Sequence, residues 1–124
     1  MKILVADDDR VISHLLCTLL QQEGHAAVAA YDAMQTLMFA MRPPVPALVV
    51  LDINMPGGTG IEALRKLKRS ARTAAIPVIV VSGSGDEAMP QAVRDLGAAD
   101  VLLKPIDGDA FLDAVRRVLT PTAA

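Results

Sequence analysis

The sequence predicts an α/β domain in which helices cover both faces of a parallel β-sheet. One observation is the run Leu48–Leu51, which is apolar without interruption and leads into a single acidic residue, Asp52. A run of this kind suits a strand that is buried on both faces, as the strands of parallel sheets are. The second observation is that strand-like and helix-like segments alternate five times, without an internal repeat. This alternation favours parallel strands with right-handed helical crossovers, and 124 residues are the size of one domain.

Composition excludes several classes of protein. Hydrophobic residues make up 52% of the chain, too many for a disordered protein, and the length allows a core without disulfides. The apolar runs fall far short of the roughly 20 residues of a membrane span, and the strand-like start leaves no room for a signal peptide. A net charge of −2 and only three aromatic residues argue against nucleic-acid binding. We therefore expect a cytoplasmic protein that contacts neither membrane nor nucleic acid directly.

Cysteine and histidine indicate no metal or disulfide site. Cys17 is the single cysteine and lies among leucines, so we interpret it as a small core residue. His14 and His25 have no third ligand nearby in the sequence, and we expect both at the surface.

The first helix is predicted between the strands Lys2–Ala6 and Ala26–Ala30. Asp8 or Asp9 is placed to cap it, because an acidic residue is favourable at a helix N-terminus. Gly24 is placed to end it in a left-handed conformation. Its apolar residues recur at helical spacing, and we expect them to form one buried face: Val11, Ile12, Leu15, Leu16, Leu19 and Leu20.

The second helix is predicted from Asp32, which can cap it, to the prolines that follow. Its helically spaced apolar residues are expected to face the core: Met34, Leu37, Met38 and Met41. A partner-binding surface is the alternative for the three methionines. The prolines end the helix and lead the chain into the central strand: Pro43, Pro44 and Pro46.

The third helix is predicted to begin with Thr59–Glu62, which reads as a capping box. Ile61, Leu64 and Leu67 are expected to face the core. The basic residues between them are interpreted as its solvated face rather than a nucleic-acid patch: Arg65, Lys66, Lys68 and Arg69.

Two further strands and two further helices complete the prediction. Ile76–Val81 and Asp100–Leu103 are the strands. The fourth helix is expected to start near Pro90 and end at Gly97, with an inward face of Met89, Ala92, Val93 and Leu96. Asp107 or Asp109 is expected to begin the last helix, with a core face of Phe111, Ala114, Val115, Val118 and Leu119.

Polar residues follow or end four of the five strands. Asp7 and Asp8 follow the first, and Asp52 follows the apolar run of the third. Ser82 ends the fourth, and Lys104 follows the fifth. Because the carboxyl ends of parallel strands open on one edge of a sheet, we expect these side chains to lie together. Two unit charges about 4 Å apart repel by roughly 4 kcal/mol at an effective dielectric constant near 20, and Mg²⁺ relieves such repulsion.

Asp52 is the residue that we expect to carry covalent chemistry. A carboxylate beside Mg²⁺, a lysine and a hydroxyl is a suitable nucleophile for a phosphoryl group, and the product is an aspartyl phosphate. Asp52 is the single acid on the central strand, whereas Asp7 and Asp8 are adjacent and better suited to hold the metal. The alternatives are that Asp7 and Asp8 only cap a helix, Ser82 belongs to a turn and Lys104 is solvated.

Four motifs resemble those of the bacterial response-regulator receiver domain and have the same spacing. They are Asp7-Asp8, Leu51–Pro56 with Gly60, Val81-Ser82 and Lys104-Pro105. This domain is a chemotaxis-regulator-like module of two-component phosphorelay signalling. The resemblance covers about residues 2–119. It implies a doubly wound, flavodoxin-like (βα)5 fold with strand order 2-1-3-4-5. We expect a receiver domain over residues 1–119, and a tail or the start of a linker over residues 120–124.

The resemblance also implies an acceptor and a metal site. Asp52 would receive the phosphoryl group from a sensor histidine kinase or a histidine phosphotransfer protein. Mg²⁺, or Mn²⁺ in its place, would bind Asp8 directly and Asp7 partly through water. The carboxylate of Asp52 and the backbone carbonyl of Asn54 would complete its ligands.

The resemblance further implies how the phosphoryl group is read. Ser82 and Lys104 would contact it, with Gly83 as part of the switch, and the Lys104-Pro105 peptide would be cis. The chain departs from the family at Val101, where an aromatic switch residue is usual, and at Gly83, where alanine is usual. A proline near the start of the fourth helix is a third departure. We therefore expect the loop from residue 83 to residue 89 and the start of the fourth helix to move instead.

Two functions from different classes fit these residues. One is a signalling switch that acts on an output partner through the face of the fourth helix, fifth strand and fifth helix, or through a homodimer that forms on phosphorylation. The other is an aspartyl-phosphate phosphohydrolase of similar architecture. Asp52-Ile53-Asn54 lacks the second aspartate that such an enzyme uses as acid and base, and the chain is too compact for a cap domain. We favour the switch. Whether the chain acts alone or within a longer protein stays open.

Overall fold

The structure is a computed structural model that describes residues 1–54, 60–83 and 89–120. Five strands form one sheet in the order β2-β1-β3-β4-β5, and all four pairings are parallel. The strands are β1 (Lys2–Ala6), β2 (Ala26–Ala30), β3 (Leu48–Asp52), β4 (Val78–Ser82) and β5 (Asp100–Leu103). The predicted flavodoxin-like α/β fold is confirmed.

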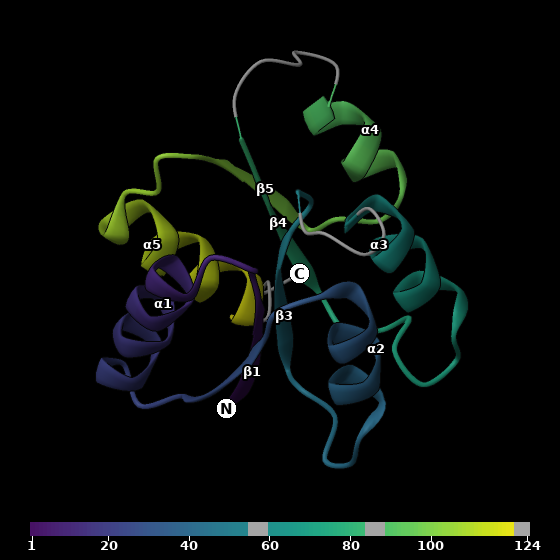
Figure 1. Ribbon diagram of the computed structural model, residues 1–124, viewed down its shortest axis with the longest axis horizontal. Coiled ribbons are helices and arrows are strands. Elements are labelled where there is room, and N and C mark those ends of the chain that lie inside the picture. Colours follow the sequence, from purple (N-terminus) through teal and green to yellow (C-terminus); the bar gives the residue numbers. More distant parts are fainter. Residues whose placement is uncertain (55–59, 84–88, 121–124) are drawn as a thin grey trace.

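Five helices connect and follow the strands: α1 (Arg10–Gln22), α2 (Ala33–Met41), α3 (Gly60–Arg69), α4 (Met89–Asp95) and α5 (Gly108–Leu119). Helices α1 and α5 cover one face of the sheet, and α2, α3 and α4 lie on the other (Figure 1). Within the residues that the structure describes, no helix is long and apolar enough to cross a membrane.

The strands divide their side chains between two cores. On β1, for example, Ile3 and Val5 pack towards α1 and α5, whereas Leu4 and Ala6 pack towards α2 and α3. This alternation follows from the two-residue period of a strand. All five residues of β3 are buried. The apolar run that predicted a central strand is therefore explained by cover on both faces.

Aspartates begin three of the helices as predicted. Asp9 caps α1 by accepting hydrogen bonds from the backbone N–H groups of Val11 and Ile12, at 2.9 and 3.2 Å. Asp32 and Asp107 cap α2 and α5 in the same way. Because Asp9 performs the capping, the carboxylate of the preceding residue, Asp8, is left for other contacts.

The buried face of α1 differs from the prediction. Val11 is 78% exposed and Leu15 is 52% exposed. The fully buried residues are Ser13, Leu16 and Leu20, with Ile12 and Leu19 partly buried beside them. The prediction was wrong for Val11 and Leu15. The apolar residues of α1 occupy a wider arc of the helix than the part that packs on the sheet, so those at the edge of the arc face solvent.

The predicted core face of α2 is only partly correct: Leu37 packs against the core and Met41 is half-buried, but Met34 and Met38 face solvent. Met34 is 71% exposed and Met38 is 53% exposed. The helix instead buries its small residues, Ala33, Thr36 and Ala40, against the sheet. Small side chains let the helix backbone approach the strands closely, and the longer side chains of Met34 and Met38 are left outside.

Smaller differences concern the second half of the chain. Strand β4 begins at Val78 rather than Ile76, although Ile76 is buried in the same core. On α4, Val93 is buried as predicted, but Ala92 is exposed. Lys68 was placed on a solvated face, yet it is half-buried and donates hydrogen bonds to the carbonyls of Ala74 and Ile76, at 3.2 and 2.8 Å. Burial lowers the pKa of its amine.

Several predictions lie wholly or partly outside the described residues. They are the capping box at Thr59, the moving loop of residues 83–89, the inward orientation of the Met89 side chain and the tail of residues 120–124. Gly24 and Gly97 end their helices with φ of +88° and +109°, as predicted. Cys17 is partly buried against the core beneath α1, and burial raises the pKa of its thiol.

Candidate functional site

Three carboxylates meet at the carboxyl ends of β1 and β3. One oxygen each from Asp7, Asp8 and Asp52 lies within 4.8 Å of the others. The two strands are neighbours in the sheet, with Ala6 beside Leu51, so the residues that follow them emerge side by side. Asp7 and Asp52 are each only 2% exposed, whereas Asp8 is exposed. The cluster therefore has a buried floor and one carboxylate open to solvent.

Backbone hydrogen bonds fix the two buried carboxylates. Oδ1 of Asp52 accepts from the N–H of Asn54 at 2.9 Å, and Oδ1 of Asp7 accepts from the N–H of Asp9 at 2.9 Å. Both are turns in which an aspartate binds its own chain two residues on. The second oxygen of each carboxylate is left for the centre of the site.

Lys104 reaches this centre from the end of β5. Its Nζ atom lies 3.1 Å from Oδ2 of Asp52 and 3.6 Å from Oδ2 of Asp7. Burial works against its charged form, but the hydrogen bond and charge of Asp52, together with the charge of Asp7, outweigh it and raise the pKa of Lys104. Its backbone N–H donates to the carbonyl of Ser82 at 2.8 Å, and the Lys104–Pro105 peptide is cis.

Asp7 is the group most strained by its surroundings. Burial raises the pKa of its carboxyl to about 6, and the charge of Asp52 adds to this effect, against the lowering effect of the hydrogen bond from Asp9. Its Oδ2 atom is buried and accepts no hydrogen bond from the described residues. At 3.6 Å the Lys104 amine is an ion-pair partner but lies beyond hydrogen-bond distance.

The donor set fits a hard divalent cation. Carboxylate oxygens are the ligands that Mg²⁺ prefers, and here three converge with one oxygen unsatisfied. Asn54, two residues beyond Asp52, is exposed at the same edge. These residues are suited to holding the metal that the sequence predicts.

Ser82 stands at the end of β4, the next strand in the sheet. It is 5% exposed, and its hydroxyl donates to the carbonyl of Gly83 at 3.0 Å. A Cβ atom on Gly83 would lie 3.2 Å from the side-chain amide of Asn54. The glycine therefore leaves room for the Asn54 side chain beside the carboxylates.

One apolar hollow borders the site at Lys104, and a second lies farther along β5. One, of about 160 Å³, lies between α1 and the segment after β5, and is lined by Ile12, Leu15, Leu16, Lys104, Pro105 and Ile106. The other is a groove of about 290 Å³ between β5 and α5, lined by Val101, Leu102, Leu103, Pro105, Ile106, Asp107 and Ala110. Val101, the residue at the expected switch position, is partly buried, and Leu103 is 59% exposed. Neither hollow was predicted, since both depend on how helices meet the sheet.

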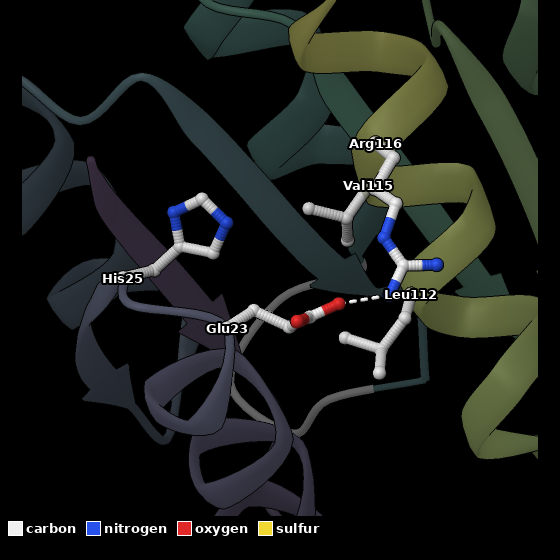
Figure 2. Close-up of a pocket in the computed structure, with 5 residues that line it drawn as sticks. All are labelled: Glu23, His25, Leu112, Val115 and Arg116. Atoms are coloured by element: carbon white, nitrogen blue, oxygen red, sulfur yellow. Dashed lines mark hydrogen bonds and ion pairs between the residues drawn. The ribbon is translucent and has the colours of Figure 1, made fainter.

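A third pocket, of about 140 Å³, lies at the opposite edge of the sheet, between the end of α1 and α5. It is lined by Glu23, His25, Leu112, Val115 and Arg116 (Figure 2). The guanidinium of Arg116 pairs with the carboxylate of Glu23 across it. None of the predicted site residues lines this pocket, so we assign to it the structural role of joining α1 to α5.

Comparison with known proteins identifies the family. The response regulator receiver domain matches residues 3–116. The chain belongs to this family. A receiver domain is a signalling module rather than an enzyme, so the phosphohydrolase alternative is not retained. Family membership also implies a phosphoacceptor role in two-component signalling.

Relatives differ in length. Protein PilH of Pseudomonas aeruginosa is 35% identical over 118 residues, which cover 95% of this chain and 97% of PilH. The phosphate regulon transcriptional regulatory protein PhoB of Escherichia coli is 34% identical over 125 residues, but the match covers 98% of this chain and 54% of PhoB. The receiver thus spans nearly all of one relative and about half of another.

Solved structures agree with the fold. NtrX from Brucella abortus, solved with ADP, superposes with a TM-score of 0.87 at 32% identity, covering 95% of this chain and 26% of NtrX. The chemotaxis protein CheY4 of Vibrio cholerae gives a TM-score of 0.87 at 25% identity, covering 95% of this chain and 98% of CheY4.

Proposed function

We propose that this receiver takes a phosphoryl group on Asp52 from the phosphohistidine of a sensor histidine kinase or a histidine phosphotransfer protein. One observation carries the proposal. The carboxylates of Asp7, Asp8 and Asp52 lie within 4.8 Å, and the Lys104 amine lies 3.1 Å from Asp52. Positioning and charge neutralisation are what phosphoryl transfer requires of a protein.

Asp52 is the acceptor. Its carboxylate ends the central strand, where one oxygen is held by a backbone N–H and the other faces Lys104. In the transfer, a carboxylate oxygen forms a bond to phosphorus while the phosphorus–nitrogen bond of the phosphohistidine breaks. The electron pair of that bond goes to the imidazole nitrogen. The product is an aspartyl phosphate.

Asp7, Asp8, Asp52 and the backbone carbonyl of Asn54 would hold a divalent cation. We expect Mg²⁺, and Mn²⁺ would suit the same oxygen ligands. When bound, the cation neutralises charge on the phosphoryl oxygens. The unsatisfied Oδ2 atom of Asp7 supports this assignment.

Lys104 and Ser82 respond to the new group. The Lys104 amine leaves the Asp52 carboxylate and binds a phosphoryl oxygen. The Ser82 hydroxyl leaves the carbonyl of Gly83 and donates to a second phosphoryl oxygen. A phosphoryl group supplies up to about two negative charges and three acceptor oxygens, which favour both changes. The movement is passed on from Gly83 to the loop that follows, most of which lies outside the described residues.

The phosphodonor docks on α1. Val11 and Leu15 are exposed there, and the hollow beneath Leu15 is bordered by Lys104 itself. An apolar partner surface seated on these residues has its histidine beside Asp52. Exposed apolar side chains next to a reactive group are typical of a binding surface rather than of a solvated helix.

The output surface is formed by α4, β5 and α5. Asp100 at the start of β5 joins α4 through Arg94, at 3.3 Å, and α5 through Arg117, at 3.5 Å. The groove beside Val101 runs between β5 and α5. An output protein, an output domain, or a second copy that pairs on phosphorylation binds here. The cytoplasmic location, the absence of direct nucleic-acid binding and the domain limits 1–119 stay predictions.

Phosphorylation with a small phosphodonor tests the proposal. In the presence of Mg²⁺ the chain is expected to gain one acid-stable, base-labile phosphate, measured by intact-mass spectrometry. Asp52→Asn abolishes the gain, as does chelation of the metal. Asp113→Asn, which removes an exposed carboxylate of α5, is the matched control and retains it. Labelling that persists in Asp52→Asn places the acceptor elsewhere.

A further inference from the structure

Helix α2 presents an uncharged surface to solvent. None of its nine residues, Ala33–Met41, is charged. Its two polar side chains are used within the fold, because Gln35 accepts from the N–H of Tyr31 at 2.9 Å and the buried Thr36 hydroxyl donates to the carbonyl of Asp32. Outward, the helix exposes Met34 and Met38, which are one turn apart. The two methionines form a short apolar stripe, which extends about 6 Å along the helix axis.

The neighbouring helix, α3, presents the opposite character. It packs beside α2 on the same face of the sheet (Figure 1). Its exposed residues include Arg65, Lys66 and Arg69, while Glu62 pairs with Arg65 at 3.1 Å. We define the α2–α3 face by its exposed residues Met34, Met38, Arg65, Lys66 and Arg69.

Charge is divided unevenly along the chain. Residues 33–75 contain six basic residues and two acidic ones, Asp52 and Glu62, and Asp52 is buried in the carboxylate site. The rest of the chain contains six basic and twelve acidic residues. A protein with a net charge of −2 therefore carries a net charge of +4 in the segment that forms α2 and α3. Such asymmetry favours an acidic partner and steers its approach.

We propose that the α2–α3 face docks an acidic amphipathic helix of a protein partner. Apolar residues of the partner helix pack on Met34 and Met38, whose unbranched side chains adapt to different partners. Its acidic residues face the basic side chains of α3. In binding of this kind, residues at helical spacing on the partner helix act as anchors.

A folded protein partner fits better than a membrane or a nucleic acid. Interfacial membrane binding uses a broad apolar surface with leucine and aromatic residues. The exposed apolar surface of α2 is much smaller, because it consists of Met34 and Met38. A nucleic acid gains nothing from an apolar stripe beside its phosphates. The inference is independent of the proposed phosphotransfer, because no residue of the α2–α3 face belongs to the carboxylate site.

Binding of a designed peptide tests the inference. The probe is a fluorescein-labelled helix of about five turns, with leucine on one face and glutamate on the other. Fluorescence anisotropy is expected to show binding that weakens as salt rises. Met34→Ser/Met38→Ser and Lys66→Glu/Arg69→Glu are each expected to weaken it by at least about tenfold. Val45→Ser, which changes an exposed apolar residue outside the α2–α3 face, is the matched control and leaves it unchanged. Circular dichroism verifies that every variant folds.

Several results overturn the inference. One is equal binding by the wild type and Met34→Ser/Met38→Ser, and another is no binding at millimolar peptide. A third is equal binding of the matched peptide with lysine in place of glutamate. Tighter binding to anionic phosphatidylserine vesicles or to duplex DNA than to the acidic peptide assigns the face to a membrane or a nucleic acid instead. Asp52→Asn is expected to lose phosphorylation but to bind the peptide as the wild type does. The experiments on phosphotransfer and on the α2–α3 face can therefore contradict one proposal without the other.

Discussion

The amine of Lys104 lies 3.1 Å from Oδ2 of Asp52, and this contact joins residues 52 positions apart in the chain. It places a positive charge from β5 against the buried acid of β3. The same amine lies 3.6 Å from Asp7. Lys104 is therefore the cation that partly neutralises the carboxylates when no metal is bound, and the proposed phosphoryl group competes for it.

Removal of Lys104 should destabilise the metal-free protein. Lys104→Ala leaves Asp7 and Asp52 buried without their cation, and we expect the free energy of unfolding to fall by about 1–3 kcal/mol, less than for a fully buried pair because the lysine is partly exposed. Urea denaturation in EDTA measures this. Mg²⁺ should restore part of the loss, and Lys104→Arg, which keeps the charge, should lose less. An unchanged free energy in Lys104→Ala would contradict the electrostatic role.

The stability of the metal-free protein should fall as the pH rises through the titration of Asp7. The pKa of Asp7 is about 6 in the folded protein, above its ordinary 3.8, so the folded state holds the proton more tightly than the unfolded state. The contribution is complete below pH 3.8 and is lost as the pH rises to about 6. Its size is of the order of 2–3 kcal/mol.

Asp7→Asn tests this effect. Compared with the wild type in urea denaturation from pH 4 to 7 in EDTA, the variant should lack this fall and be more stable near neutral pH, while it binds Mg²⁺ less tightly. Asp8→Asn, in which the lost carboxylate is exposed, is the matched control and should change the profile less. A wild-type profile that rises over the same range would show that other groups dominate.

Much of the site could be predicted from sequence because it depends on where strands end. Asp52 follows a run whose burial on both faces is evident from its composition, and parallel strands bring the residues after them to one edge. The exposed faces of α1 and α2 could not be predicted in the same way. Helical spacing alone does not say whether Met34 or the small Ala33 and Thr36 meet the sheet, because that choice is made by packing between elements.

Gly60 should not tolerate a side chain. A Cβ atom there would collide with Cα of Ile53 and lie 2.7 Å from the carbonyl oxygen of Asp52, both of them backbone atoms that cannot rotate away. We expect Gly60→Ala to lower the free energy of unfolding by roughly 3 kcal/mol or more and to weaken Mg²⁺ binding by displacing Asp52. Gly83→Ala is the matched control, since its Cβ meets only the Asn54 side chain, at 3.2 Å. Equal stability of the two variants would show that β3 and α3 can separate at little cost.

The exposed apolar residues of α1 should affect the rate of phosphotransfer from a histidine kinase but not from a small phosphodonor. Val11→Ser/Leu15→Ser removes the proposed docking surface but none of the carboxylate site. Phosphotransfer from a cognate histidine kinase should slow by about tenfold or more, whereas the rate with a small phosphodonor should stay unchanged. Rapid-quench measurement of both rates separates docking from chemistry. If both rates fall together, the substitutions have disturbed the site itself, and if neither falls, the kinase docks elsewhere.

Phosphorylation should be relayed through the segment after β4 rather than through residue 101. The Ser82 hydroxyl, which now donates to the carbonyl of Gly83, moves to the phosphoryl group and displaces that glycine. Val101 is β-branched and small, so it has few alternative rotamers with which to transmit the change. A bistable segment biased by a charge is a common form of switch.

Hydrogen exchange with and without a phosphate mimic should therefore show changes in protection concentrated in residues 83–96. Val101→Ala should leave these changes largely intact, and Asp52→Asn, the control without an acceptor, should show none. Changes centred on α1, or changes that disappear in Val101→Ala, would mean that the signal leaves the site by another route.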